Sequence, residues 1–189
     1  MNDTKYLLAY TIPLSSIIGL QVGGVWSFTT VLYAFGLIPL WEAFLEPDQS
    51  KLSEEKIKNR LSNRFFDLML YFNLIIVFAI LIFGIKHLTS QTLATYEKVG
   101  LVLSFGIVLG TNGINVAHEL GHRKTKWERF LAKVLLMPAF YMHFYIEHNF
   151  GHHLNVGTPS DPATSKKNQS VFSFWLTSIT GQIKNAIRI

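Results

Sequence analysis

Long apolar runs separated by short polar segments dominate the chain. The first run, from Tyr6 to Trp41, contains 36 consecutive residues without a charged side chain. A helix needs about 20 apolar residues to cross the core of a bilayer, and this run is nearly twice that length. Gly23-Gly24 lies near its middle, and paired glycines break helices. The pattern therefore predicts two closely spaced spans, about 6–22 and 24–44, forming a hairpin in preference to one long tilted helix.

Two further runs have the length of single membrane spans. They cover about 65–85 and 99–117, and a short polar loop, 86–98, separates them. A fifth apolar stretch, 130–146, contains Lys133, Pro138 and His143, and it is predicted to be a short, re-entrant or interfacial helix. A last stretch, 171–183, is too short to span a bilayer. The sequence thus predicts an all-α, integral-membrane helical bundle forming one partial domain over 1–189.

Composition supports a membrane protein. Only 15% of the residues are charged, against roughly 25% in a typical globular domain, and the mean hydropathy is positive. The chain has no cysteine, which excludes disulfides, Cys-ligated zinc, iron–sulfur clusters and Cys nucleophiles. The net charge of +5 does not indicate nucleic acid, because the basic residues lie at the ends of apolar segments, where membrane topology explains them.

The basic residues also predict an orientation. Loop 46–64 carries five of them, loop 86–98 carries two, and the segment that follows the fourth span carries five. Segments rich in Lys and Arg stay on the cytoplasmic side of a membrane. The N-terminus and the segment after the fourth span are therefore predicted to be cytoplasmic.

Histidines supply the candidate chemistry. Six of the seven fall within 36 residues: His118, His122, His143, His148, His152 and His153. His118 and His122 are four residues apart, as are His148 and His152, and this spacing places two imidazoles on one face of a helix. His153 points about 100° away from His152 on a helix and is able to serve a second metal. His87, the seventh histidine, lies in the predicted external loop and is assigned no role.

Spacing alone does not choose the metal, because imidazole binds Zn, Cu, Fe and Ni. His118-Glu119-Leu120-Gly121-His122 also fits the H-E-x-x-H signature of zinc proteases, in which the glutamate is the general base. That alternative leaves the second histidine motif unexplained. A metal transporter is a third alternative, but it would place its ligands within the spans, whereas these histidines cluster at the cytoplasmic ends.

Three sequence blocks resemble the membrane alkane monooxygenases. They are Asn115 to Arg123, His143 to His153, and Thr158-Pro159-Ser160-Asp161-Pro162-Ala163. The first is similar to the family's first histidine box, except that Arg123 stands where Lys is usual. The second is similar to the family's second box. The wider superfamily includes fatty-acid desaturases and xylene-type monooxygenases, and the Glu-His-Asn-x-Gly-His-His form favours the alkane branch.

The resemblance implies a cytoplasmic-side di-iron centre and terminal hydroxylation of alkanes with dioxygen. It further implies two Fe ions as cofactors, rubredoxin and its reductase as electron donors, and a multi-pass location in the bacterial inner membrane. By motif position the iron ligands would be His118, His122, His148, His152 and His153. The role of His143 is left open. Glu119 and Glu147 are expected to orient ligand imidazoles rather than bind iron.

Length is the main departure from this family. Its members are about twice as long and carry a further histidine box downstream, whereas no histidine follows His153. The sequence analysis therefore expects a truncated chain that binds at most one iron and does not hydroxylate alkanes by itself.

Overall fold

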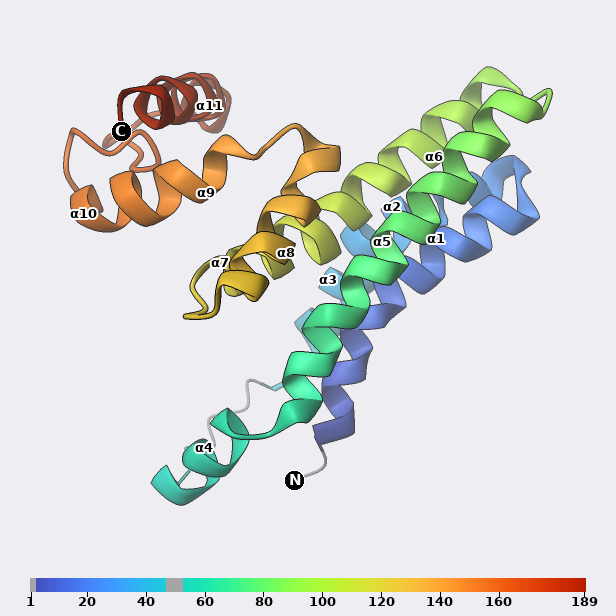
Figure 1. Ribbon diagram of the computed structural model, residues 1–189. Coiled ribbons are helices and arrows are strands. Elements are labelled where there is room, and N and C mark those ends of the chain that lie inside the picture. Colours follow the sequence, from blue (N-terminus) through green and yellow to red (C-terminus); the bar gives the residue numbers. More distant parts are fainter. Residues whose placement is uncertain (1–2, 47–52) are drawn as a thin grey trace. The chain divides into compact units, whose positions relative to one another are not determined.

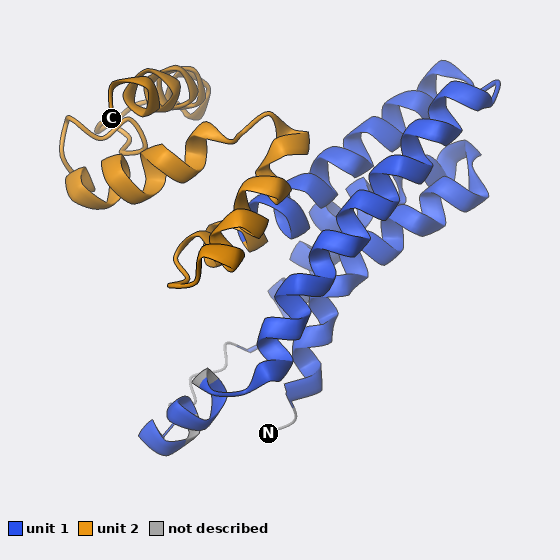
Figure 2. Ribbon diagram, viewed as in Figure 1, with its two compact units in different colours: residues 1–115 blue, residues 116–189 orange. Residues whose placement is uncertain are grey.

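The computed structural model describes residues 3–46 and 53–189, and all the regular secondary structure within these two ranges is helical (Figure 1). This confirms the predicted all-α fold. Pro47, Asp48 and Lys51 of the predicted polar loop lie outside the described residues. The chain forms two compact units, residues 1–115 and 116–189 (Figure 2). The single partial domain over 1–189 stays a prediction.

The first unit opens with the predicted helical hairpin. Gly23 and Gly24 adopt φ values of 68° and 58°, in the left-handed region that glycine tolerates best, and they separate the two arms. The arms pack on each other through α1, η2 and α2. In chain order the hairpin consists of the 3-10 helix η1 (Asp3–Tyr10), α1 (Thr11–Val22), the 3-10 helix η2 (Gly24–Phe28), α2 (Thr29–Leu32), the π-helix η3 (Tyr33–Leu37) and α3 (Ile38–Phe44).

The rest of this unit is a short polar helix and two long apolar ones. The Asn63 side chain accepts a hydrogen bond from the Phe65 amide (3.0 Å) and so caps the start of α5. Both long helices pack against α1. The elements are α4 (Glu54–Leu61), α5 (Arg64–Ser90), α6 (Thr95–Val108) and the π-helix η4 (Leu109–Ile114).

Three helical stretches among the described residues are long and apolar enough to cross a membrane. They are Gly24–Phe44, Arg64–Ser90 and Thr95–Gly121, and they correspond to the second, third and fourth predicted spans. The first predicted span, about 6–22, corresponds to η1 and α1, which are not among the three. The four-span topology therefore stays a prediction.

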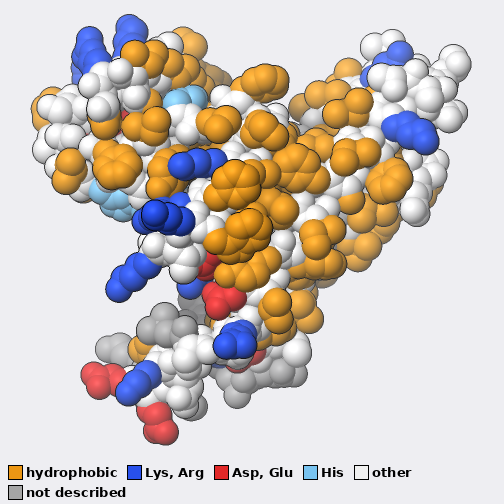
Figure 3. Space-filling model, in the orientation of Figure 1, with side chains coloured by type: hydrophobic (Ala, Val, Ile, Leu, Met, Phe, Trp, Pro, Cys, Tyr) orange, Lys and Arg blue, Asp and Glu red, His pale blue; other side chains and the backbone are white. Residues whose placement is uncertain are grey.

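The first unit is apolar outside and partly polar inside. On α5, Ile75, Ile82 and Phe83 each expose more than 60% of their surface, and hydrophobic side chains cover most of the visible face of the long helices (Figure 3). Inside, the Asn112 side chain donates from Nδ2 to the side-chain Oδ1 of Asn73 at 2.7 Å. Lipid tails are as apolar as leucine side chains, so the hydrophobic effect does not drive helices together within a bilayer. Small and polar residues supply the interhelical contacts of membrane proteins instead. The pattern fits a bundle that is surrounded by lipid.

The second unit contains all six clustered histidines. Thr125 caps α8 by accepting from the Glu128 amide (3.2 Å), and Phe140, at φ 52°, reverses the chain after it. The Tyr141 hydroxyl then donates to Gln182 (2.8 Å), which ties the start of the next helix to α11. The elements are α7 (Asn115–Gly121), α8 (Lys126–Leu136), the 3-10 helix η5 (Met137–Ala139), α9 (His143–Glu147), the π-helix η6 (His148–His152), α10 (His153–Asn155) and α11 (Val171–Arg188).

The apolar stretches of this unit form amphipathic helices. The stretch 130–146 is divided between α8, a turn and α9. Helix α8 has 11 residues, too few to cross a bilayer, and it buries Leu131 and Leu135 while exposing Phe130. Helix α11 is not among the three candidate membrane helices. Between α7 and α9 the segment 123–146 folds back as a hairpin, as predicted.

Candidate metal centre

The first histidine motif begins on α7 and ends at His122, the residue directly after that helix. His118 and His122 are one turn apart, and their ring centroids are separated by 4.8 Å. Leu120, between them, is fully buried and anchors the helix, whereas both histidines are exposed. The helix therefore presents two imidazoles side by side on its outer face, as the four-residue spacing predicted.

The second motif begins at the end of α9 and continues through a π-turn. The segment His148–His152 is π-helical, and a π-turn bonds residue i to residue i+5. This brings His148 and His153 to one face, with their Nε2 atoms 3.1 Å apart. On a regular α-helix, residues five apart would diverge by about 140°. The π-turn is thus what turns His153 toward the cluster, and π-turns of this kind are frequent at functional sites.

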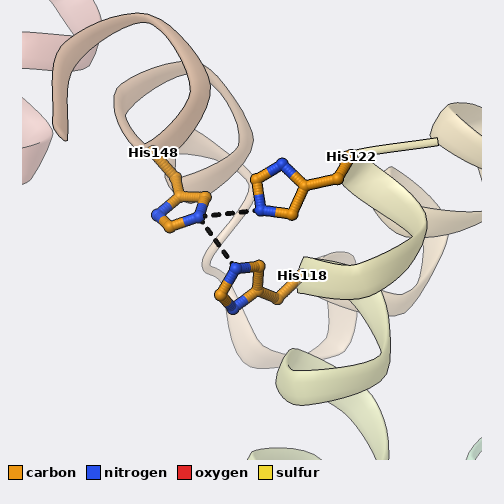
Figure 4. Close-up of side chains that lie close together, drawn as sticks. All are labelled: His118, His122 and His148. Carbon is orange, nitrogen blue, oxygen red and sulfur yellow. Dashed lines mark hydrogen bonds between the residues drawn. The ribbon is translucent and has the colours of Figure 1, made fainter. Parts of the chain in front are cut away.

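The two motifs converge on one nitrogen atom. His148 Nε2 lies 2.9 Å from His118 Nε2 and 3.2 Å from His122 Nε2 (Figure 4). With His153, three imidazole nitrogens surround that of His148. His118, His122 and His148 form a group of ligand atoms that lie within 4.8 Å of one another, a geometry able to hold a metal ion.

The donor chemistry of this cluster fits a cation. An imidazole Nε2 carries either one proton or one lone pair, so it makes one hydrogen bond in the ring plane. His148 Nε2 has three nitrogen neighbours, and hydrogen bonding alone cannot satisfy all of them. Ligands of a tetrahedral ion with bonds of about 2 Å would be separated by roughly 3.3 Å. The observed separations are close to that value, so a metal ion suits the arrangement.

Burial keeps the central imidazole neutral. His148 is 8% exposed, and burial, with His118, His153 and His122 nearby, lowers the pKa of His148 to about 4. Its ring stacks on Phe144 at a centroid distance of 4.7 Å. At neutral pH the His148 ring therefore carries a single proton, and its other nitrogen keeps the lone pair that binds a metal.

His152 lies beside the cluster and has a carboxylate partner. Its ring stacks on that of His148, with centroids 5.4 Å apart, and its Nδ1 lies 2.9 Å from Asp161 Oδ2. Burial by itself would raise the pKa of the Asp161 carboxyl. Hydrogen bonds from Thr164, Ala163 and His152 outweigh that effect and hold the pKa below its usual range.

The remaining polar residues of the two motifs have different surroundings. Burial lowers the pKa of His143, whose ring packs against Tyr141 at 4.7 Å. Glu119 pairs with Arg123 at 3.2 Å. Glu147 is 1% exposed; burial raises its pKa, and it accepts a hydrogen bond from Asn185.

Asp161 is a carboxylate that hydrogen-bonds a motif imidazole, that of His152. The sequence had predicted such a role for Glu119 and Glu147, and that stays a prediction. It lies in the third block that resembles the alkane monooxygenases, so its position in that block was the available signal. Asp161 is nine residues from His152 in the sequence. That separation does not predict a contact, which depends on how the intervening loop folds.

Comparison with known proteins supports the resemblance. A family model described as fatty acid desaturase matches residues 97–187. The alkane 1-monooxygenase 1 of Alcanivorax borkumensis is 37% identical over 96% of this chain and 46% of its own length. The alkane 1-monooxygenase of Pseudomonas putida is 32% identical over 98% of this chain and 48% of its own length.

A more distant relative is the hydroxylase component of a xylene/toluene monooxygenase of Pseudomonas putida, 28% identical over 100% of this chain and 50% of its own length. The chain thus spans about half the length of the curated relatives it matches. The sequence matches confirm the predicted resemblance: over almost all of its residues, this chain is similar in sequence to curated alkane 1-monooxygenases.

Proposed function

We propose that this chain carries two histidine motifs of a non-haem di-iron membrane monooxygenase that hydroxylates the terminal carbon of an alkane. The observation that carries the proposal is the convergence of the His118, His122 and His153 nitrogens on His148 Nε2, at 2.9–3.2 Å. The printed names of the relatives support the reaction class. Six alkane 1-monooxygenases are 29–37% identical to this chain and a seventh is 26% identical, against 28% for the xylene/toluene enzyme, and this balance favours an alkane substrate.

An alkane offers no acidic proton and no electrophilic carbon, so acid–base catalysis by side chains is not sufficient. Iron, when bound, would supply the oxidising chemistry with dioxygen. The protein residues would hold the metal, and burial, which lowers the pKa of His148, favours the neutral form of this imidazole. His118, His122, His148 and His153 would donate their Nε2 lone pairs, and His152 would serve a neighbouring position. Two Fe ions are proposed because the resemblance to the alkane monooxygenases implies a di-iron centre, of which the five histidines of this segment would supply part of the ligands.

The surroundings proposed for this site follow from the apolar helices and the basic loops. An alkane partitions into the bilayer, where the exposed apolar faces of the long helices would lie. The five-two-five distribution of basic residues supports a cytoplasmic site in a bacterial inner membrane. Rubredoxin and rubredoxin reductase are the proposed electron donors.

Metal identity is the first test. The protein is purified in detergent, and its iron and zinc contents are measured by mass spectrometry, with Mössbauer spectroscopy on ⁵⁷Fe-grown material. The proposal expects iron in excess of zinc and a spectrum of high-spin, nitrogen-ligated non-haem iron. One tightly bound zinc per chain, together with peptide hydrolysis, would instead support the zinc-protease alternative.

Product analysis is the second test. The gene product, as its host expresses it, is incubated with rubredoxin, rubredoxin reductase and NADH, and is given octane or para-xylene in parallel. We expect 1-octanol as the main product of the gene product that the host expresses, and no turnover by the 189 residues alone, which are expected to bind at most one iron. A preference for xylene would move the assignment to the xylene-type branch. Oxidation of neither compound by iron-loaded protein, with the electron donors shown to be competent, would contradict the proposed reaction.

A further inference from the structure

Asp161 is a buried carboxylate with hydrogen-bond donors at both oxygens. Its side chain is 0% exposed. Oδ1 accepts from the Ala163 amide at 2.9 Å. Oδ2 lies 2.9 Å from His152 Nδ1 and also accepts from the Thr164 hydroxyl. A carboxylate taken out of water is costly unless such donors compensate it. This environment therefore stabilises the ionised form.

An ionised carboxylate accepts hydrogen bonds and cannot donate them. The short contact to Asp161 therefore requires His152 Nδ1 to carry the ring proton, and the lone pair of His152 is left on Nε2. His152 belongs to the second motif, and its ring lies against His148, the centre of the cluster. Metal-binding histidines commonly donate their other ring N–H to a carboxylate, which fixes the tautomer and the ring orientation.

The loop that carries Asp161 is itself held in place. Asp161 N donates to Thr158 O at 3.2 Å, and Thr164 N donates to Asp161 O at 3.1 Å. Pro162 packs directly on Gly181 of α11, where an added Cβ would lie 2.5 Å from the Pro162 Cβ. The close approach of the loop to α11 leaves the carboxylate little freedom to turn away from His152.

We propose that Asp161 is a positioning residue, which fixes His152 in the Nδ1–H tautomer and so leaves Nε2 free to bind a metal ion. The proposal rests on the proposed function for the metal, but the tautomer itself is a property of the metal-free protein. It therefore can be tested whether or not the cluster holds iron.

The Asp161→Asn variant separates a positioning role from a purely structural one. The amide has the shape of the carboxylate, and its oxygen still accepts from the Ala163 amide. Its NH₂ group then faces His152 Nδ1, which must accept a hydrogen bond, so the ring proton moves to Nε2 and blocks metal binding. Thr164→Val is the matched control. It removes a hydroxyl that bonds both Asp161 Oδ2 and the Gly157 amide, and so loosens the loop while the carboxylate stays beside His152.

Two measurements on the detergent-purified full chain decide the matter. The first is ¹⁵N–¹H correlation NMR of metal-free, ¹⁵N-histidine-labelled protein, with His152 assigned by His152→Gln. We expect Nδ1–H in the wild type and in Thr164→Val, and Nε2–H in Asp161→Asn. The second is Co²⁺ affinity from optical titration, where we expect a loss of about 10–100-fold in Asp161→Asn and a near-wild-type value in Thr164→Val.

Several outcomes would overturn the proposal. One is an Nε2–H tautomer of His152 in the wild type, and another is an unchanged tautomer in Asp161→Asn. Equal losses of Co²⁺ affinity in Asp161→Asn and Thr164→Val would mean that Asp161 acts only through the loop. If the wild type shows the expected tautomer and its loss in Asp161→Asn but binds no metal, the positioning role stands and the proposed function fails.

Discussion

At the residue scale, identical spacing in the sequence leads to different surroundings in the fold. His148 and His152 are four residues apart and were expected to act alike. His148 Nε2 instead meets three other imidazoles, whereas His152 is bonded through Nδ1 to Asp161. Residue type and spacing predicted that these side chains gather. They could not predict which ring lies at the centre, because that depends on the π-turn and on the loop that carries Asp161.

His143 and His148 make a matched pair for testing the cluster. Both belong to the second motif, and both rings pack on aromatic neighbours. His143 Nε2 is buried and has no hydrogen-bond partner, so phenylalanine would remove a polar group whose burial is costly. We expect His143→Phe to keep metal affinity near the wild-type value, with unchanged or higher thermal stability.

His148→Phe should behave in the opposite way. It keeps a ring that can stack on Phe144, but it removes the nitrogen on which the other three converge. We expect a loss of Co²⁺ affinity larger than the roughly 100-fold that removal of an outer partner causes, with the helical circular dichroism of the wild type. Equal effects of the two substitutions would contradict the assignment of His148 as the central ligand.

At the element scale, the sequence predicted where a helix breaks, but it did not predict where π-helical turns interrupt the regular α-helical hydrogen bonding. The break at Gly23-Gly24 follows from the conformational freedom of glycine, and it was predicted. The π-helical turns η3, η4 and η6 also contain glycine, but as isolated residues rather than pairs, and an isolated glycine does not specify a π-turn. In η4 a tertiary contact is also present, the hydrogen bond from Asn112 to Asn73 of α5. The π-turn at His148–His152 was therefore beyond the reach of the sequence.

Two glycines of α6 give an element-scale prediction. A Cβ at Gly100 would lie 2.4 Å from Ser27 Oγ and 2.8 Å from the Phe28 ring, whereas a Cβ at Gly106 would meet nothing within 4 Å. Ser27 is fully buried and cannot move aside. We expect Gly100→Ala to destabilise the protein by about 1–3 kcal/mol through overpacking.

Gly106→Ala is the control in the same helix. It should be neutral or stabilising by about 0.5–1 kcal/mol, because alanine is the better helix former. The measurement is the free energy of unfolding in detergent micelles, followed by circular dichroism during titration with a denaturing detergent. If Gly100→Ala is as stable as Gly106→Ala, α6 does not pack against η2 as closely as the structure indicates.

At the scale of the whole molecule, the sequence predicted a membrane bundle with a histidine-rich segment, and apolar length was sufficient for that inference. It was less informative about 6–22. That run begins beside Asp3 and Lys5 and contains Pro13, and its helical elements are not among the three that are long and apolar enough to span. Composition near a helix end does not decide between a span and an interfacial helix, because both bury one apolar face.

The orientation prediction does not depend on that uncertain first span. If the two consecutive candidate spans, Arg64–Ser90 and Thr95–Gly121, both cross the membrane, they return the chain to the side from which it started. Lys58 and Lys126 are then predicted to share a side, with Thr92 opposite. The positive-inside rule makes the shared side cytoplasmic, because both flanking segments are rich in Lys and Arg.

We expect fusions of alkaline phosphatase after Lys58 and Lys126 to be inactive in a bacterial host, and a fusion after Thr92 to be active. Fusions of green fluorescent protein at the same three positions should give the reverse pattern. An active phosphatase after Lys126 would place the histidine cluster on the outer side of the membrane, away from any cytoplasmic electron donor, and would contradict both the topology and the proposed partners.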